Sequence, residues 1–121
     1  MGKTVAILGA SNNPNRFSYR ALRMLIDHGH KTIPVSPKMK EIEGVSVLPS
    51  LADVKEPVDT LTMYVGPERS TTLSREILNL HPKRVIFNPG SENRELAKAL
   101  EKEGVQVIED CTLVMLREGS F

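Results

Sequence analysis

Residues 9–16 are the segment of this chain best equipped to hold a phosphate. They follow the apolar run 5–8 and read Gly9, Ala10, Ser11, Asn12, Asn13, Pro14, Asn15, Arg16. Backbone N–H groups of such a turn, and the positive end of a following helix, attract anions. The G-x-G-x-x-G pattern of dinucleotide enzymes is incomplete, because Ser11 and Pro14 stand where two of its glycines belong. Two interpretations stay open: a phosphate loop assisted by Ser11, the Asn side chains and Arg16, and a polar turn that only caps a helix.

A second group of polar residues follows the apolar run 32–35. It reads Ser36, Pro37, Lys38, Met39, Lys40, with no carboxylate before Glu41. NAD enzymes keep an acid at this point, which hydrogen-bonds the ribose hydroxyls. Lysines instead suit a nucleotide with an extra phosphate on its ribose, as in NADP and coenzyme A. The alternative is a solvated basic loop.

Five short apolar runs, rich in β-branched residues and followed by Gly, Pro, Ser or Asn, predict the strands that position these segments. The runs are 5–8, 32–35, 60–65, 85–87 and 105–108. Their apolarity is continuous rather than alternating, which a strand requires when helices cover both faces of its sheet. We therefore expect parallel strands.

Apolar residues at helical spacing predict the connections between these strands. A helix over 17–28 ends at Gly29, a second begins near Pro67, a third ends at Gly104, and Ser50 caps a single turn over 50–53. The expected fold is α/β: one Rossmann-like doubly wound domain over residues 1–121, with helices on both faces of a five-stranded parallel sheet of order 3-2-1-4-5. Ligands of such sheets bind outside the carboxyl ends of the strands, where the order reverses.

Catalytic groups are poorly placed in this arrangement. His28, His30 and His81 fall at the opposite edge of the sheet, so none reaches a ligand as a general base. Ser11 and Ser18 have no evident activating base. We expect no catalytic residue.

Glu92 and Cys111 fall at the carboxyl edge, where each has two interpretations. Glu92 faces the ligand or favours a helix amino terminus, and Cys111 meets a ligand thiol or is an ordinary buried cysteine. One cysteine and three histidines do not reach the spacing of a structural zinc site. We expect no metal.

Charge and hydropathy exclude several function classes. The 121 residues include 16 Lys and Arg against 15 Asp and Glu, a net charge of +1, so no global field favours nucleic acid or an anionic membrane. No apolar window approaches the length of a membrane span, and no leader precedes the first strand. With a single cysteine, these features predict a cytoplasmic protein in a reducing compartment.

At several places along nearly the whole chain, the residues resemble the small coenzyme A-binding domain proteins, which are related to the nucleotide-binding domain of the succinyl-CoA synthetase α subunit. The matching features are Gly9-x-Ser11-x-x-Pro14-x-Arg16-x-Ser18, Pro34-Val35-Ser36-Pro37-Lys38, Gly44 followed by Pro49-Ser50-Leu51-Ala52-Asp53, Val58-Asp59, and Asn88-Pro89-Gly90.

The resemblance implies a role for each segment. Ser11, Asn12, Asn13 and Pro14 would meet the phosphates of coenzyme A, and Lys38 or Lys40 the ribose phosphate. Val65, Gly66 and Pro67 would flank the adenine, while Phe87, Asn88 and Pro89 approach the pantetheine arm. The expected binding set is completed by Gly9, Ala10, Arg16, Ser18, Ser36 and Gly90.

The sequence thus predicts a module that binds coenzyme A or an acyl-CoA without catalysis of its own. Its expected partner is this small nucleotide ligand, with a homo-oligomer left open. Two alternatives remain: an NADP-linked oxidoreductase, and a regulatory or interaction protein that has kept the fold without a ligand.

Overall fold

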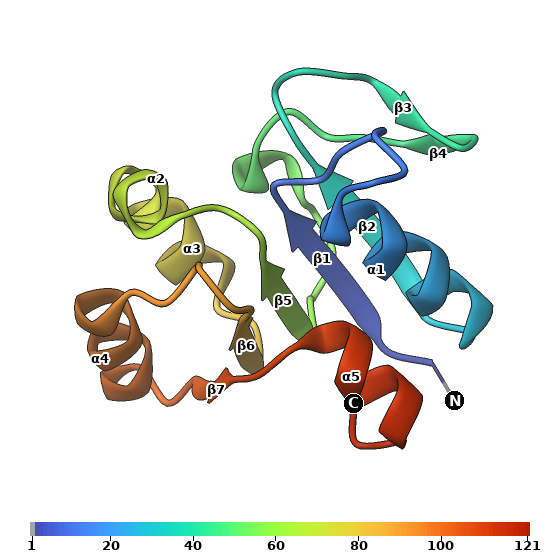
Figure 1. Ribbon diagram of the computed structural model, residues 1–121. Coiled ribbons are helices and arrows are strands. Elements are labelled where there is room, and N and C mark those ends of the chain that lie inside the picture. The colour runs from blue at the N-terminus through green and yellow to red at the C-terminus, as the bar shows by residue number, and fades with distance from the viewer. Residues whose placement is uncertain (1) are drawn as a thin grey trace.

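Five parallel strands form one sheet in the computed structural model, which describes residues 2–121 (Figure 1). The order across the sheet is β2-β1-β5-β6-β7. The strands are β1 (Thr4–Leu8), β2 (Lys31–Val35), β5 (Thr60–Met63), β6 (Arg84–Phe87) and β7 (Gln106–Glu109). A short hairpin of β3 (Glu41–Ile42) and β4 (Val45–Ser46) lies outside this sheet. The predicted α/β fold with a parallel sheet is confirmed.

The predicted strand order 3-2-1-4-5 is wrong in one respect. The third expected strand, β5, pairs with β1 instead of lying outside β2, so the order in that numbering is 2-1-3-4-5. All four residues of β5 are buried, as is common for a strand inside a sheet, whereas the edge strand β2 begins with the exposed Lys31. The place beside β2 is taken by a single parallel bridge between Val35 and Leu48. The reversal of order therefore lies between β1 and β5.

Helices cover both faces of the sheet, as predicted (Figure 1). They are α1 (Phe17–Asp27), α2 (Pro67–Thr72), α3 (Ser74–Leu80), α4 (Arg94–Lys102) and α5 (Thr112–Glu118), with a one-turn 3₁₀ helix at Leu51–Asp53. The Ser50 hydroxyl accepts from the Ala52 N–H, so the expected cap forms. The single helix expected after Pro67 is two helices, α2 and α3, and α5 was not predicted at all.

Each face of the sheet has its own apolar core. On β1, Val5 and Ile7 pack with Leu22 and Leu25 of α1, while Ala6 and Leu8 face the opposite cluster. Successive side chains of a strand point to opposite faces, so a strand covered on both faces must be apolar throughout. The continuous apolar runs of the sequence thus reflect a sheet with two cores.

A buried amide ties the carboxyl ends of two strands to the last helix. The Asn88 Nδ2 donates to Thr62 Oγ1 at 2.7 Å and to the Met63 carbonyl at 2.9 Å, while Asn88 Oδ1 accepts from the Thr112 N–H at 2.9 Å. Asn88 is only 3% exposed. Both of its side-chain N–H groups are occupied, so this amide has a structural role.

Replacing Asn88 should therefore destabilise the fold. Asn88→Ala leaves the Thr112 N–H and the Met63 carbonyl without this partner, at a cost of about 1–3 kcal/mol in the free energy of unfolding. Urea denaturation measures this difference. Asn79→Ala is the matched control, because Asn79 is an exposed asparagine on α3. Equal stability of the two variants would contradict the structural role of Asn88.

Candidate functional site

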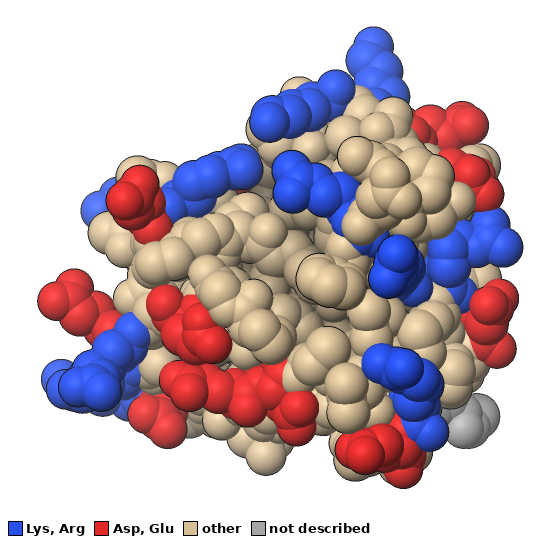
Figure 2. Space-filling model, viewed as in Figure 1, with Lys and Arg blue, Asp and Glu red and all other residues tan. Residues whose placement is uncertain are grey.

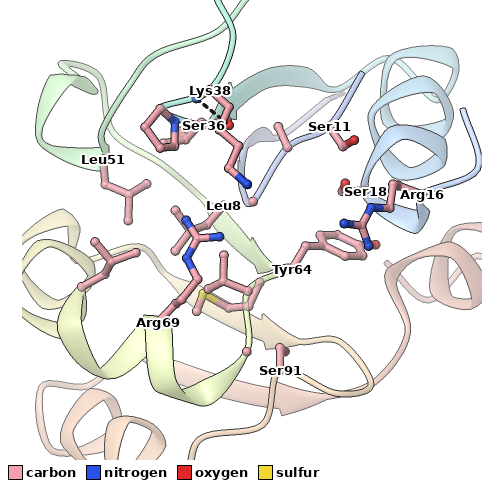
Figure 3. A pocket seen from close by; sticks show the side chains of 18 of the residues that line it. Leu8, Ser11, Arg16, Ser18, Ser36, Lys38, Leu51, Tyr64, Arg69 and Ser91 are labelled. Carbon is pink, nitrogen blue, oxygen red and sulfur yellow. Dashed lines mark hydrogen bonds between the residues drawn. The ribbon is translucent and has the colours of Figure 1, made fainter. Parts of the chain in front are cut away.

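A cleft of about 650 Å³ opens at the carboxyl ends of β1, β2 and β5 (Figure 3). Its walls come from the loops that follow these strands, the beginning of α2 and the turn after β6. The cleft lies at the reversal of strand order between β1 and β5, the position where doubly wound sheets bind ligands. Its volume is in the range of small-molecule binding sites, which is about 300–1,000 Å³.

Gly9 allows the loop after β1 to approach the loop after β5. Its φ is 93°, and a Cβ built there would lie 2.8 Å from the Tyr64 carbonyl oxygen and 2.9 Å from Val65 Cγ1. A side chain would therefore clash as well as strain the backbone. The N–H groups of Gly9 and Ala10 both donate to the Val35 carbonyl at 3.1 Å, so they hold the loop against β2 and are not free for a ligand.

The next residues form two local turns and lead into α1. The Ser11 hydroxyl accepts from the Asn13 N–H at 3.1 Å, and Asn13 Oδ1 accepts from the Asn15 N–H at 2.9 Å. These bonds fix the path of the loop. Asn12, Asn13 and Pro14 shape the loop from its exposed side and do not line the cleft.

The amino end of α1 borders the cleft without a side-chain cap. The first backbone hydrogen bond of the helix runs from the Arg20 N–H to the Arg16 carbonyl, and the side chain of the N-cap residue, Arg16, makes no capping hydrogen bond. The N–H groups of the first turn therefore have no partner within the helix and carry its positive end. Arg16, Phe17 and Ser18 line the cleft here. This arrangement suits an anion.

Three cations and one acid line the cleft: Arg16, Lys38 and Arg69, with Glu76. Glu76 Oε1 accepts from the Ser50 hydroxyl at 2.6 Å. Figure 2 shows several Lys and Arg side chains on the upper part of the molecule and a group of Asp and Glu side chains below its centre, with charges of both signs at the edges. The charge of the cleft is therefore predominantly positive although the chain is almost neutral overall.

The structure brings together most of the predicted binding residues. Those that line the cleft are Gly9, Ala10, Ser11, Arg16, Ser18, Ser36, Lys38, Val65, Gly66, Pro89 and Gly90. Outside its lining lie Asn12, Asn13, Pro14, Lys40, Pro67, Phe87 and Asn88. Phe87 and Asn88 are buried, and Lys40 is exposed beyond the cleft wall. The two lysines of the loop after β2 are thus separated, with only Lys38 at the cleft.

The cleft also contains residues that the sequence analysis did not select. They include Met63, Tyr64, Arg69 and Ser91, together with Leu51 and Leu73. Tyr64 directly follows β5, but the predicted strand 60–65 extends past it, so the sequence prediction placed Tyr64 inside the strand. Arg69 lies inside α2, and nothing in the local sequence distinguishes it from the other exposed arginines.

The groups considered for catalysis lie elsewhere. In the part of the chain that the structure describes, no histidine lines the cleft, nor does Cys111. His30 Nδ1 accepts from the Lys3 N–H at 3.0 Å, and burial lowers the His30 pKa. Glu92 Oε1 accepts from the Gly90 N–H at 2.8 Å and so stabilises the turn after β6.

Tyr64 is the titratable side chain of the cleft with a large pKa shift. Burial raises the pKa of Tyr64 to about 12. The phenol therefore stays protonated at neutral pH and is a poor base.

Two further properties follow from residues 2–121. They contain no group of three or more His, Cys, Asp or Glu side chains arranged to hold a metal ion. None of their helices combines the length and apolarity needed to cross a membrane.

Solved structures and curated proteins share this architecture. One crystal structure, of an uncharacterized protein, is 44% identical with a TM-score of 0.95 and covers 100% of this chain and 99% of that one. The uncharacterized protein YneT of Bacillus subtilis is 29% identical over 108 residues, which are 89% of this chain and 80% of YneT.

A larger protein contains a related region. The α subunit of ADP-forming acetate–CoA ligase II of Pyrococcus furiosus is 29% identical over 109 residues, which cover 85% of this chain and 23% of that subunit. The family model described as the CoA binding domain matches residues 3–117. With the strand order, the cleft and its lining in place, this match over almost the whole chain shows that the protein belongs to the CoA binding domain family.

Proposed function

We propose that this protein binds coenzyme A or an acyl-CoA in the cleft between β1 and β5 and performs no catalysis of its own. One observation carries the proposal: the uncapped amino end of α1 shares the cleft with Arg16 and Lys38. Glu76, the acid that lines the same cleft, accepts a hydrogen bond from the Ser50 hydroxyl. Such a site stabilises phosphate groups. Membership of the CoA binding domain family supports coenzyme A as the nucleotide.

The diphosphate is expected at the amino end of α1. Because the Gly9 and Ala10 N–H groups donate to the Val35 carbonyl, the donors for phosphate begin with Ser11 and continue into the first turn of the helix. Arg16 and the Ser18 hydroxyl line the same wall. Charge-assisted hydrogen bonds of this kind contribute roughly twice as much as neutral ones.

Lys38 is the expected contact for the ribose phosphate. Its own N–H donates to the Ser36 hydroxyl at 3.2 Å, which fixes the turn from which the side chain extends into the cleft (Figure 3). Lys40 does not line the cleft, so the structure favours Lys38 of the two lysines.

Apolar side chains offer a surface for the adenine and the pantetheine arm. Leu8, Leu51, Met63 and Val65 line the cleft, and we expect the adenine against Val65 and Gly66. The pantetheine arm then passes toward Pro89 and Gly90. Phe87 and Asn88 directly precede Pro89 in the chain and are buried, so they do not line the cleft.

Coenzyme A should bind more tightly than NAD. NAD has no ribose phosphate for Lys38, and no acid follows β2 to bind its ribose hydroxyls. Titration calorimetry of both ligands at one fixed salt concentration measures the preference. NAD binding that equals or exceeds coenzyme A binding would refute this assignment.

Lys38→Ala should weaken coenzyme A more than its 3′-dephospho form. The lost contact is a charge-assisted one, for which about 1.5–3 kcal/mol is typical, or roughly 10- to 150-fold in Kd. Calorimetry on the two ligands measures it, with Lys40→Ala as the matched control from the same loop. Equal weakening of both ligands would mean that Lys38 does not contact the ribose phosphate.

The purified protein should not turn over acetyl-CoA. No histidine of the described chain lines the cleft, and the phenol of Tyr64 is held protonated by burial, which raises its pKa to about 12. Thiol release from acetyl-CoA measures any activity, with Cys111→Ser as the control for incidental acyl transfer to this cysteine. Several thiols released per protein molecule would show that the domain is an enzyme.

A further inference from the structure

Two cations from opposite walls of the cleft point toward each other. Lys38 extends from the loop after β2, and Arg69 extends from α2 (Figure 3). Within residues 2–121, neither side chain takes part in an ion pair. Two like charges that face each other across a cleft repel, and an anion placed between them removes this repulsion.

The acid of the cleft is not a partner of Arg69. Glu76 lines the same cleft but accepts the Ser50 hydroxyl proton at 2.6 Å, a contact that joins α3 to the turn before Leu51–Asp53. The guanidinium therefore remains available to a ligand. Its five N–H donors form a planar fork that matches phosphate oxygens.

The backbone that carries Arg69 is fixed by buried contacts. Asn93 Nδ2 donates to Ser70 Oγ at 2.8 Å, to Thr71 Oγ1 at 3.1 Å and to the Pro67 carbonyl at 3.3 Å. Ser70 is fully buried. These bonds hold α2 against the beginning of α4, so Arg69 starts from a fixed position in the cleft wall and does not depend on a mobile loop.

The charge of the pair selects a kind of phosphate. A phosphomonoester carries about −1.5 to −2 at pH 7, whereas each phosphate of a diphosphate diester carries about one negative charge. Two converging cations therefore match a phosphomonoester better than a single lysine does. Coenzyme A contains one such group, the 3′-phosphate of its ribose, and NADP contains another, the 2′-phosphate.

We propose that Arg69 and Lys38 form a two-cation clamp on the ribose 3′-phosphate, and that Arg69 is a specificity residue for 3′-phosphorylated nucleotides. This inference rests on the proposed coenzyme A site and adds a residue from the opposite wall. It also explains how a cleft with an incomplete glycine pattern gains selectivity: the discriminating charges lie outside the loop after β1.

The test is titration calorimetry with coenzyme A, 3′-dephospho-coenzyme A and NADP. Arg69→Ala should weaken coenzyme A at least about tenfold and the dephospho form less than about twofold. Arg75→Ala, which removes an exposed arginine of α3 outside the cleft lining, should leave both affinities unchanged. Because Arg69 is exposed, its variant should unfold within about 3 °C of the unaltered protein.

The possible outcomes separate the claims. Equal weakening of coenzyme A and the dephospho form would place Arg69 on the diphosphate and overturn the clamp, as would unchanged affinity for both. Tighter binding of NADP, with the same dependence on Arg69, would overturn the choice of the 3′-phosphate. If the unaltered protein binds no coenzyme A, the proposed function fails and the clamp fails with it.

Discussion

The site depends on one constraint, the reversal of the chain's direction across the sheet between β1 and β5. From β1 the chain passes to α1 on one face, and from β5 it passes to α2 on the other, so the carboxyl edge between these strands is left open. The two loops still meet at its base, because Gly9 has no side chain to collide with Tyr64 and Val65. The strand order therefore produces both the open edge between β1 and β5 and the contact between the two loops at its base.

The electrostatics of the cleft follow from the same arrangement. The reversal directs the amino ends of α1 and α2 toward the opening. Arg16 comes from the start of α1, Lys38 from the loop after β2, and Arg69 from α2. Glu76 accepts a hydrogen bond from Ser50, and three cations line the cleft against this one acid. A chain with a net charge of +1 thus presents a local anion site, which an argument from total charge does not reveal.

Local patterns predicted the parts of this fold better than their assembly. Apolar runs located the strands, and Gly29 and Ser50 marked helix boundaries, because these signals act over a few residues. The position of β5 beside β1 depends on burial on both sides, which only the assembled sheet determines. The helix α5 has seven residues, too few for a clear period, and became visible only through its packing against α1.

The binding residues divide in the same way. Loop residues such as Ser11 and Lys38 follow strands directly, so the sequence placed them at the cleft. Arg69 was missed because it faces Lys38 from another wall of the cleft, distant from Lys38 in the chain. Asn88 was expected at the ligand, whereas both N–H groups of its side-chain amide donate to acceptors within the protein.

The central claim is coenzyme A binding at this edge, and amide NMR shifts during a coenzyme A titration test it most directly. The account predicts changes centred on Ser11, the first turn of α1, Lys38 and Arg69, whereas absent changes, or changes centred on His30 and His81 at the opposite edge, would contradict it.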